Sequence, residues 1–318
     1  YSNMSIFDGS NRGSYSDTPA PKVFNTVTSL DPQLFASVDE YADSLLTRKP
    51  LGKITPVAVA AQLDEWARSS AADLARADGQ IADRRDPAYR RLVTDCSIAR
   101  GTGRFFASKL RAAVLYAIFD RTSDPRARTE ALDQYRQARR IWADFAAGPA
   151  SAYVRDITFG YATQLRGHWQ DRLPAIDRDI AAMEVRAAER RGGAVPEEAA
   201  AAAIAAVLTP RAAPVIPVEH TPPSYFRPGD AFSVAVRAPR EATGIGLVYR
   251  HLNQAETYRS LDMRREGGAW TAQVPADYTQ SPYPLQYYFE VRAAAGVALW
   301  PGFRSDFLGR PYFVAEPS

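Results

Sequence analysis

The chain has 318 residues, 46% hydrophobic and 24% charged, which is enough for two domains with full cores. Its 39 basic and 36 acidic residues leave a net charge of only +3, so composition gives no electrostatic case for a nucleic-acid-binding protein. The single cysteine, Cys96, excludes an intramolecular disulfide and a cysteine-based zinc site, and no apolar run is long enough to predict a membrane span.

Residues 1–28 are rich in Ser, Asn, Gly, Asp and Thr and show little periodicity. Such a segment would be disordered alone, yet this one contains Ile6, Phe7 and Phe24. The sequence therefore predicts an extended N-terminal arm that packs on another surface, for which an upstream domain is one candidate.

Residues 29–191 have the apolar spacing of amphipathic helices. An N-cap residue followed by proline at the first helical position marks a helix start. This signal and related prolines predict five helices, which begin at Asp31-Pro32, Thr55-Pro56, Pro87, Asp124-Pro125 and Leu173-Pro174. Short connections between them predict an antiparallel α-helical bundle.

Residues 192–223 are predicted to be an Ala/Pro-rich linker, with an alanine run at 199–206 and several prolines between Pro210 and Pro223. His220 lies at its end and is assigned to an interdomain hinge. Beyond the linker, residues 224–318 alternate apolar and polar positions in about seven short segments, as Phe232, Val234 and Val236 illustrate. In residues 285–291 the alternation predicts one face with Leu285, Tyr287, Phe289 and Val291. The predicted fold is thus α+β and multidomain, with a helical bundle followed by an immunoglobulin- or fibronectin-III-like β-sandwich.

The candidate site lies in the one non-helical insertion of the bundle, between Tyr153 and Arg172. A histidine can hydrogen-bond sugar hydroxyls, an arginine can pair with a carboxylate, and a tryptophan offers a flat face to a pyranose ring. These chemistries make a candidate substrate-binding set of Asp156, Arg166, His168, Trp169 and Asp171. The structural alternative is that Trp169 plugs the bundle end and His168 caps a neighbouring carbonyl.

Other groups favour structural roles. Asp177 and Asp179 are two residues apart on a helix and so face different sides; together with Asp171 they are expected to be solvated surface acids. The three histidines are far apart in sequence, so no metal site or other cofactor is predicted, and His251 is expected to be exposed. Aromatic residues of the β region are candidates for a sugar-stacking platform or for core packing: Tyr225, Phe226, Tyr278, Tyr283, Tyr288 and Trp300.

Several short motifs carry a resemblance to a known family. They include Leu165-Arg166-Gly167-His168-Trp169 in the helical part, and Leu285-Gln286-Tyr287-Tyr288-Phe289-Glu290-Val291, Trp300-Pro301-Gly302 and Pro311-Tyr312-Phe313-Val314 in the β part. In their order they resemble the C-terminal helical bundle and β-sandwich of large bacterial α-glucuronidase-like glycoside hydrolases. The resemblance implies a catalytic (β/α)8 barrel that is absent from this sequence, and a secreted or periplasmic protein.

The leading functional hypothesis is an accessory, non-catalytic region of a glycoside hydrolase that acts on a polysaccharide or a uronic-acid-containing glycan. Its partners would be an upstream catalytic domain or partner chain, a glycan, or a second copy. A free-standing glycan-binding protein is one alternative. The other is an enzyme with its own site at the bundle–sandwich cleft, built from Asp156, Arg166, His168 and Asp171.

Overall fold

The computed structural model describes residues 4–8, 23–158, 166–188, 195–210, 214, 216–253, 255–304 and 309–318. The chain divides into two compact units. The helical unit comprises Tyr1–Lys49 and Ile54–Arg211, and the β unit comprises Pro50–Lys53 and Ala212–Ser318.

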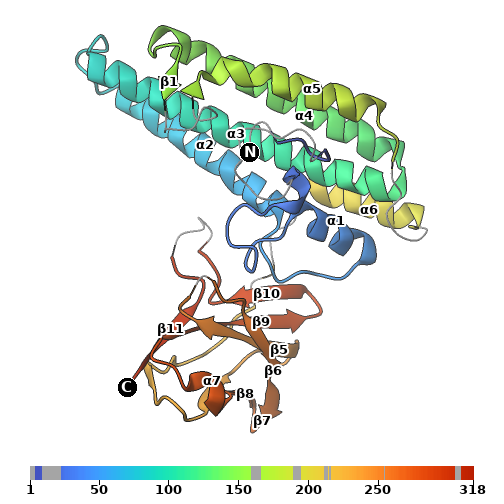
Figure 1. The fold of residues 1–318 in the computed structure, drawn as a ribbon, viewed down its shortest axis with the longest axis vertical. Coiled ribbons are helices and arrows are strands. Elements are labelled where there is room, and N and C mark those ends of the chain that lie inside the picture. The colour runs from blue at the N-terminus through green and yellow to red at the C-terminus, as the bar shows by residue number, and fades with distance from the viewer. Residues whose placement is uncertain are drawn as a thin grey trace. The chain divides into compact units, whose positions relative to one another are not determined.

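The helical unit is built from long α-helices with short elements between them (Figure 1). In chain order these are η1 (Phe24–Thr26), α1 (Val38–Thr47), α2 (Pro56–Asp78), α3 (Pro87–Thr122), α4 (Pro125–Ala147), η2 (Gly148–Ser151), β1 (Ile157–Thr158), β2 (Arg166–Gly167), η4 (Trp169–Arg172), α5 (Leu173–Val185) and α6 (Glu197–Leu208). Helices α2, α3 and α4 pack side by side, and α5 lies along α4.

Side-chain caps set the helix starts. Thr55, Asp86 and Asp124 each accept a hydrogen bond from a backbone N–H of the first turn, and each is followed by proline. The predicted starts at Thr55-Pro56, Pro87 and Asp124-Pro125 are therefore confirmed. The predicted start at Asp31-Pro32 is wrong, because α1 begins at Val38 behind a reciprocal capping box of Ser37 and Glu40.

One apolar core runs through the helical unit, and α6 belongs to it. Ala203, Ile204 and Val207 of α6 are buried in this core, although the sequence assigned them to a linker. An alanine-rich helix packs closely because its side chains are small, whereas its composition alone resembles that of a spacer.

The N-terminal segment is also part of this core. Met4 and Ile6 are buried in it, and the Phe24 N–H donates to the Ser5 carbonyl oxygen at 2.8 Å. Residues 4–8 and 23–27 thus lie together on the helices of their own chain. For these described residues, the surface on which the predicted arm packs is the helical unit of the same chain.

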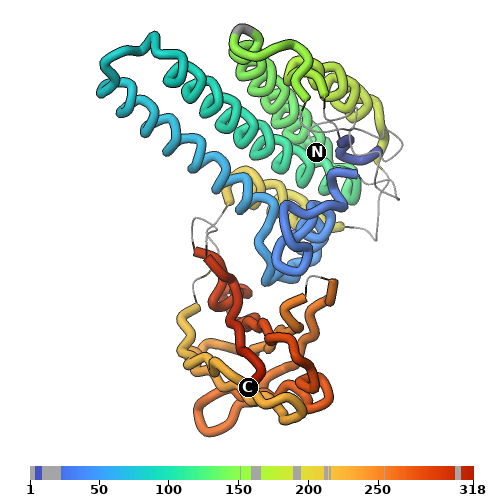
Figure 2. Tube along the Cα trace, turned by 60° about the vertical axis from the view of Figure 1, so that its left-hand side comes forward, coloured from blue at the N-terminus to red at the C-terminus, as the bar shows by residue number. Residues whose placement is uncertain are grey.

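The end of the unit where α2 turns into α3 has few neighbours. Between Arg68 and Arg100, all of which the structure describes, no residue is buried. The turn lies apart from α4 and α5 (Figure 2). In this part of the hairpin α2 and α3 pack on each other, and Asp95 of α3 also accepts a hydrogen bond from the Tyr153 hydroxyl.

The β unit contains two main sheets. One has the order β3 (Tyr225–Phe226), β11 (Phe313–Pro317), β9 (Leu285–Ala293), β5 (Ala242–His251) and β6 (Arg259–Asp262), with β10 (Gly296–Trp300) also paired to β9. The other has the order β4 (Phe232–Val236), β8 (Ala269–Val274) and β7 (Arg264–Glu266), and a short helix α7 (Ala276–Thr279) follows β8. Among the described strands of this unit, the pairings are antiparallel except that of β3 with β11.

Alternate residues of both sheets point into one core. On β9 these are Leu285, Tyr287, Phe289 and Val291, the set that the alternation of the sequence predicts. None of the helices in the described part of the chain is long and apolar enough to cross a membrane.

Candidate functional site

A small hairpin positions the predicted site residues. Strand β1 pairs with β2 through Ile157–Gly167 and Thr158–Arg166, which places Asp156 close to Arg166. The Arg166 guanidinium donates to the Asp156 carboxylate, and both side chains are more than half exposed. The structure thus brings these two residues together as a surface ion pair.

The next residues form a cap for η4. The Asp171 carboxylate accepts from the His168 backbone N–H at 2.7 Å, while His168 Nδ1 accepts from the Gln170 N–H at 3.3 Å. Gly167 has φ +112°, and a Cβ there would lie 2.9 Å from Asp171 Oδ2. The close turn therefore requires glycine. The His168 side chain is buried, and its Nε2 has no hydrogen-bond partner among the described residues.

Trp169 packs on the helices. Its carbonyl oxygen accepts from Trp142 Nε1–H at 2.7 Å, and its ring meets the edge of Tyr153 at a centroid distance of 5.6 Å. The half-buried side chain contacts the core of the helical unit. These contacts favour the structural alternative, in which Trp169 plugs the end of the bundle. They do not test whether Trp169 binds a sugar.

The neighbouring carboxylates have two different environments. Asp177 is exposed and pairs with Arg139 at 2.8 Å, which lowers the pKa of the Asp177 carboxyl. Asp179 is buried, so the prediction of a solvated acid is wrong for this residue. It accepts from Ser5 Oγ at 2.5 Å and from the Ile6 N–H at 3.2 Å, donors that come from the N-terminal segment.

A buried lysine faces the same segment. Lys109 on α3 is fully buried and donates from Nζ to the Met4 carbonyl oxygen at 2.6 Å. Its ammonium lies 4.6 Å from the centroid of the Phe24 ring. Burial lowers the pKa of Lys109 to about 8, although the charge of Asp179 partly opposes the shift. Lys109 and Asp179 thus hold the N-terminal segment against the helices.

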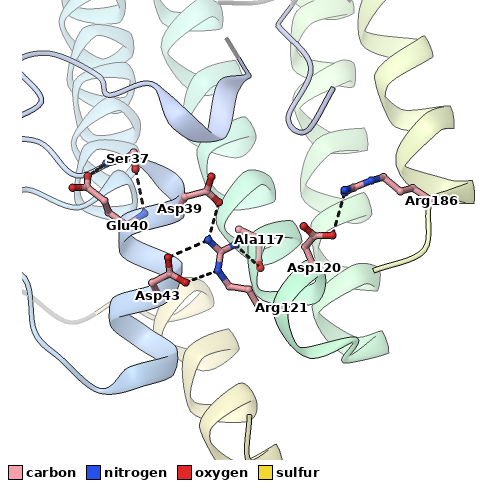
Figure 3. A network of polar contacts seen from close by, with 8 residues as sticks. All are labelled: Ser37, Asp39, Glu40, Asp43, Ala117, Asp120, Arg121 and Arg186. Carbon is pink, nitrogen blue, oxygen red and sulfur yellow. Dashed lines mark hydrogen bonds and ion pairs between the residues drawn. The ribbon is translucent and has the colours of Figure 1, made fainter. Parts of the chain in front are cut away.

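A second polar network joins α1 to α3 (Figure 3). Arg121 is buried and donates from Nε to Asp43 Oδ1 at 2.5 Å and from Nη2 to Asp39 Oδ1 at 3.0 Å. The neighbouring Asp120 accepts from Arg186 Nη1 at 3.1 Å. Burial opposes the charged guanidinium, yet the two carboxylates raise the pKa of Arg121 overall. The Arg121 guanidinium thus links two carboxylates of α1 to α3.

The β unit holds a polar cluster that the sequence did not reveal. His251 stacks on Tyr278 at 4.3 Å, and its Nδ1 lies 3.0 Å from Glu256 Oε2. The Tyr278 hydroxyl donates to the same carboxylate at 3.0 Å. Burial, together with the Glu256 contact, raises the pKa of Tyr278 to about 12. The loop that carries Glu256 and helix α7 cover His251 at the end of β5. The prediction that His251 is exposed is therefore wrong.

His220 also lies in a different place from the predicted hinge. Its Nδ1 lies 2.7 Å from the Ala235 carbonyl oxygen, its Nε2 lies 2.9 Å from the Tyr287 hydroxyl, and its ring meets the edge of Phe289. The neutral tautomer with hydrogen on Nδ1 satisfies both contacts. Burial lowers the pKa of His220, which is consistent with that form.

Most aromatic residues of the β unit are core residues. Phe226, Tyr278 and Tyr288 are buried, and Trp300 packs against the core. Tyr225 and Tyr283 are 67% and 59% exposed. Of the six candidates for a sugar platform, only these two present most of their side chain to solvent.

Among the described residues, no three His, Cys, Asp or Glu side chains gather as a metal site requires. No known protein family matches the chain, and no curated protein matches its sequence.

Proposed function

We propose that this chain is an accessory, non-catalytic region of a carbohydrate-active glycoside hydrolase that acts on a polysaccharide or uronic-acid-containing glycan. The observation that carries the proposal is that the charged groups at the predicted site make contacts within the fold. Asp156 pairs with Arg166, and Asp171 caps the turn at His168. Their polar atoms hold the hairpin and η4 together, which is a structural task.

The other internal charges support the same proposal. Lys109 and Asp179 bind the N-terminal segment, and Arg121 joins two helices. A helical body in which the buried Lys109 and Arg121 both have hydrogen-bond partners suits a scaffold that supports another module. We further propose that the two sheets of the β unit form an immunoglobulin- or fibronectin-III-like sandwich, because they share one core. Secretion or export to the periplasm is part of this proposal.

The deciding experiment determines the coding sequence and the intact mass of the native polypeptide. We expect a longer polypeptide with a barrel region ahead of Tyr1. A native protein that begins at Tyr1 would contradict the accessory role.

A hydrolysis assay of the 318-residue chain on aryl glycosides and glucuronoxylan complements that measurement. We expect no turnover. Turnover that Asp171→Asn abolishes, in a variant that keeps the wild-type circular dichroism, would instead support the alternative of an active site in this chain. A glycan-binding role for Tyr225 and Tyr283 remains a separate hypothesis.

A further inference from the structure

The α2–α3 hairpin has an uneven distribution of charge. All four acids of α2 are in ion pairs: Asp64 with Arg111, Glu65 with Arg68, Asp73 with Arg76, and Asp78 with Arg84. In contrast, residues 87–104 of α3 contain four arginines and a single acid, Asp95, which accepts from the Tyr153 hydroxyl. Positive charge on this half of α3 is therefore not balanced locally.

Three of these arginines share one face of α3. At 3.6 residues per turn, Arg90, Arg100 and Arg104 fall within an arc of about 80° and along about 21 Å of the helix. Arg90 and Arg104 are exposed and Arg100 is half-buried, and no ion pair engages them within the described part of the chain. We call these three residues the α3 stripe.

On this face of the helix, the residues between the arginines of the α3 stripe have short side chains. Val93 and Ser97 lie in the same arc and are short, so they do not cover the longer arginine side chains. Arg111 continues the same face towards the bundle, where it pairs with Asp64 at 2.7 Å. An arginine on this face of α3 thus pairs with a carboxylate that lies close to it.

We propose that the α3 stripe binds a linear polysaccharide that carries carboxylate groups. Guanidinium groups form paired, charge-assisted hydrogen bonds with carboxylates, and three of them along a straight helix suit a ligand whose charges repeat along its length. The choice of a uronate polymer rests on the proposed function. A nucleic acid is disfavoured because the three residues of the α3 stripe offer no aromatic ring for base stacking.

The experiment measures binding of polygalacturonate to the full chain by calorimetry or affinity electrophoresis at low ionic strength. The test variant is Arg90→Gln/Arg100→Gln/Arg104→Gln, in which glutamine keeps the helix propensity. The matched control is Arg68→Gln/Arg136→Gln/Arg139→Gln, which removes the same three charges from arginines that already pair with Glu65, Glu184 and Asp177. Circular dichroism verifies that both variants are folded.

We expect the test variant to weaken binding by about tenfold or more and the control to leave it nearly unchanged, because three modest charge pairs are removed together. Binding should also vanish in about 1 M salt, where the Debye length is about 3 Å. Fully methyl-esterified polygalacturonate keeps the same backbone without the charges and should not bind.

Four results would overturn the proposal. They are no binding by the wild-type chain at low ionic strength, equal loss in the test and control variants, equal binding of the esterified polymer, and single-stranded DNA binding as tightly as polygalacturonate. A native polypeptide without a catalytic region would refute the accessory role but would leave these binding results in force, so the two failures are distinguishable.

Discussion

At the scale of single residues, the most unusual group is the Lys109 ammonium in the core of the helical unit. Water solvates it in the unfolded chain, whereas in the folded protein it has a carbonyl, aromatic rings and the Asp179 carboxylate around it. Burial disfavours the charged form, so the pKa falls from its ordinary value of 10.5 to about 8.

This shift predicts a stability change with pH. Between about pH 8 and 10.5 the unfolded chain holds a proton on Lys109 that the folded protein has released, so the free energy of unfolding rises with pH. The rise is at most about 1.4 kcal/mol per pH unit. Urea unfolding from pH 8 to 9, below the ordinary tyrosine pKa of 10.0, should show it in the wild type and not in Lys109→Met. An identical pH profile in the two proteins would contradict the assignment.

Arg121 contributes to stability differently from Lys109, because its charge is paired with the carboxylates of Asp39 and Asp43. Arg121→Met should lower the free energy of unfolding by about 2 kcal/mol, less than for a fully buried pair since Asp43 is largely exposed. Arg121→Lys should be intermediate, because lysine keeps the charge but not the planar fork that reaches both carboxylates. Asp43→Asn should cost about 0–1 kcal/mol. Chemical denaturation ranks the three variants, and a lysine variant as stable as the wild type would refute the geometric role.

At the scale of elements, the close approach of α3 and α4 depends on one glycine. A Cβ on Gly101 would lie 2.4 Å from the Phe145 ring, whereas a Cβ on Gly103 would meet nothing closer than 3.8 Å. Both glycines are in the interior of α3, where alanine is intrinsically better by about 1 kcal/mol.

The two positions therefore form a matched pair. Gly103→Ala should leave stability unchanged or raise it by up to about 1 kcal/mol. Gly101→Ala should lower it by about 1–3 kcal/mol, because the helices must move apart or Phe145 must leave its rotamer. Thermal unfolding compares them directly, and equal effects would show that α3 and α4 can separate at this contact at little cost in stability.

At the scale of the whole molecule, each unit has its own apolar core. We therefore expect local stability to be set unit by unit. In hydrogen exchange monitored by mass spectrometry, Phe289→Ala should lower protection in the β unit, and Gly101→Ala should lower it in the helical unit. Loss of protection across both units in either variant would show that they unfold as one.

The sequence by itself determined the α+β class, the helix starts at Thr55-Pro56 and Asp124-Pro125, and the inward face of β9. These depend on local signals, namely caps, prolines and periodicity, which act within a few residues. Residue chemistry also selected a candidate site in the insertion before α5, and the binding role of its residues stays a prediction.

Only the tertiary structure decided what lies far apart in sequence. Asp179 is buried because Ser5 and Ile6 supply its donors from the other end of the unit, and His251 is covered by a loop and α7. Helix α6 joins the core because the surface it needs belongs to α1 and α3. The environment of a side chain, and hence its charge state and chemistry, depends on partners that no local pattern specifies.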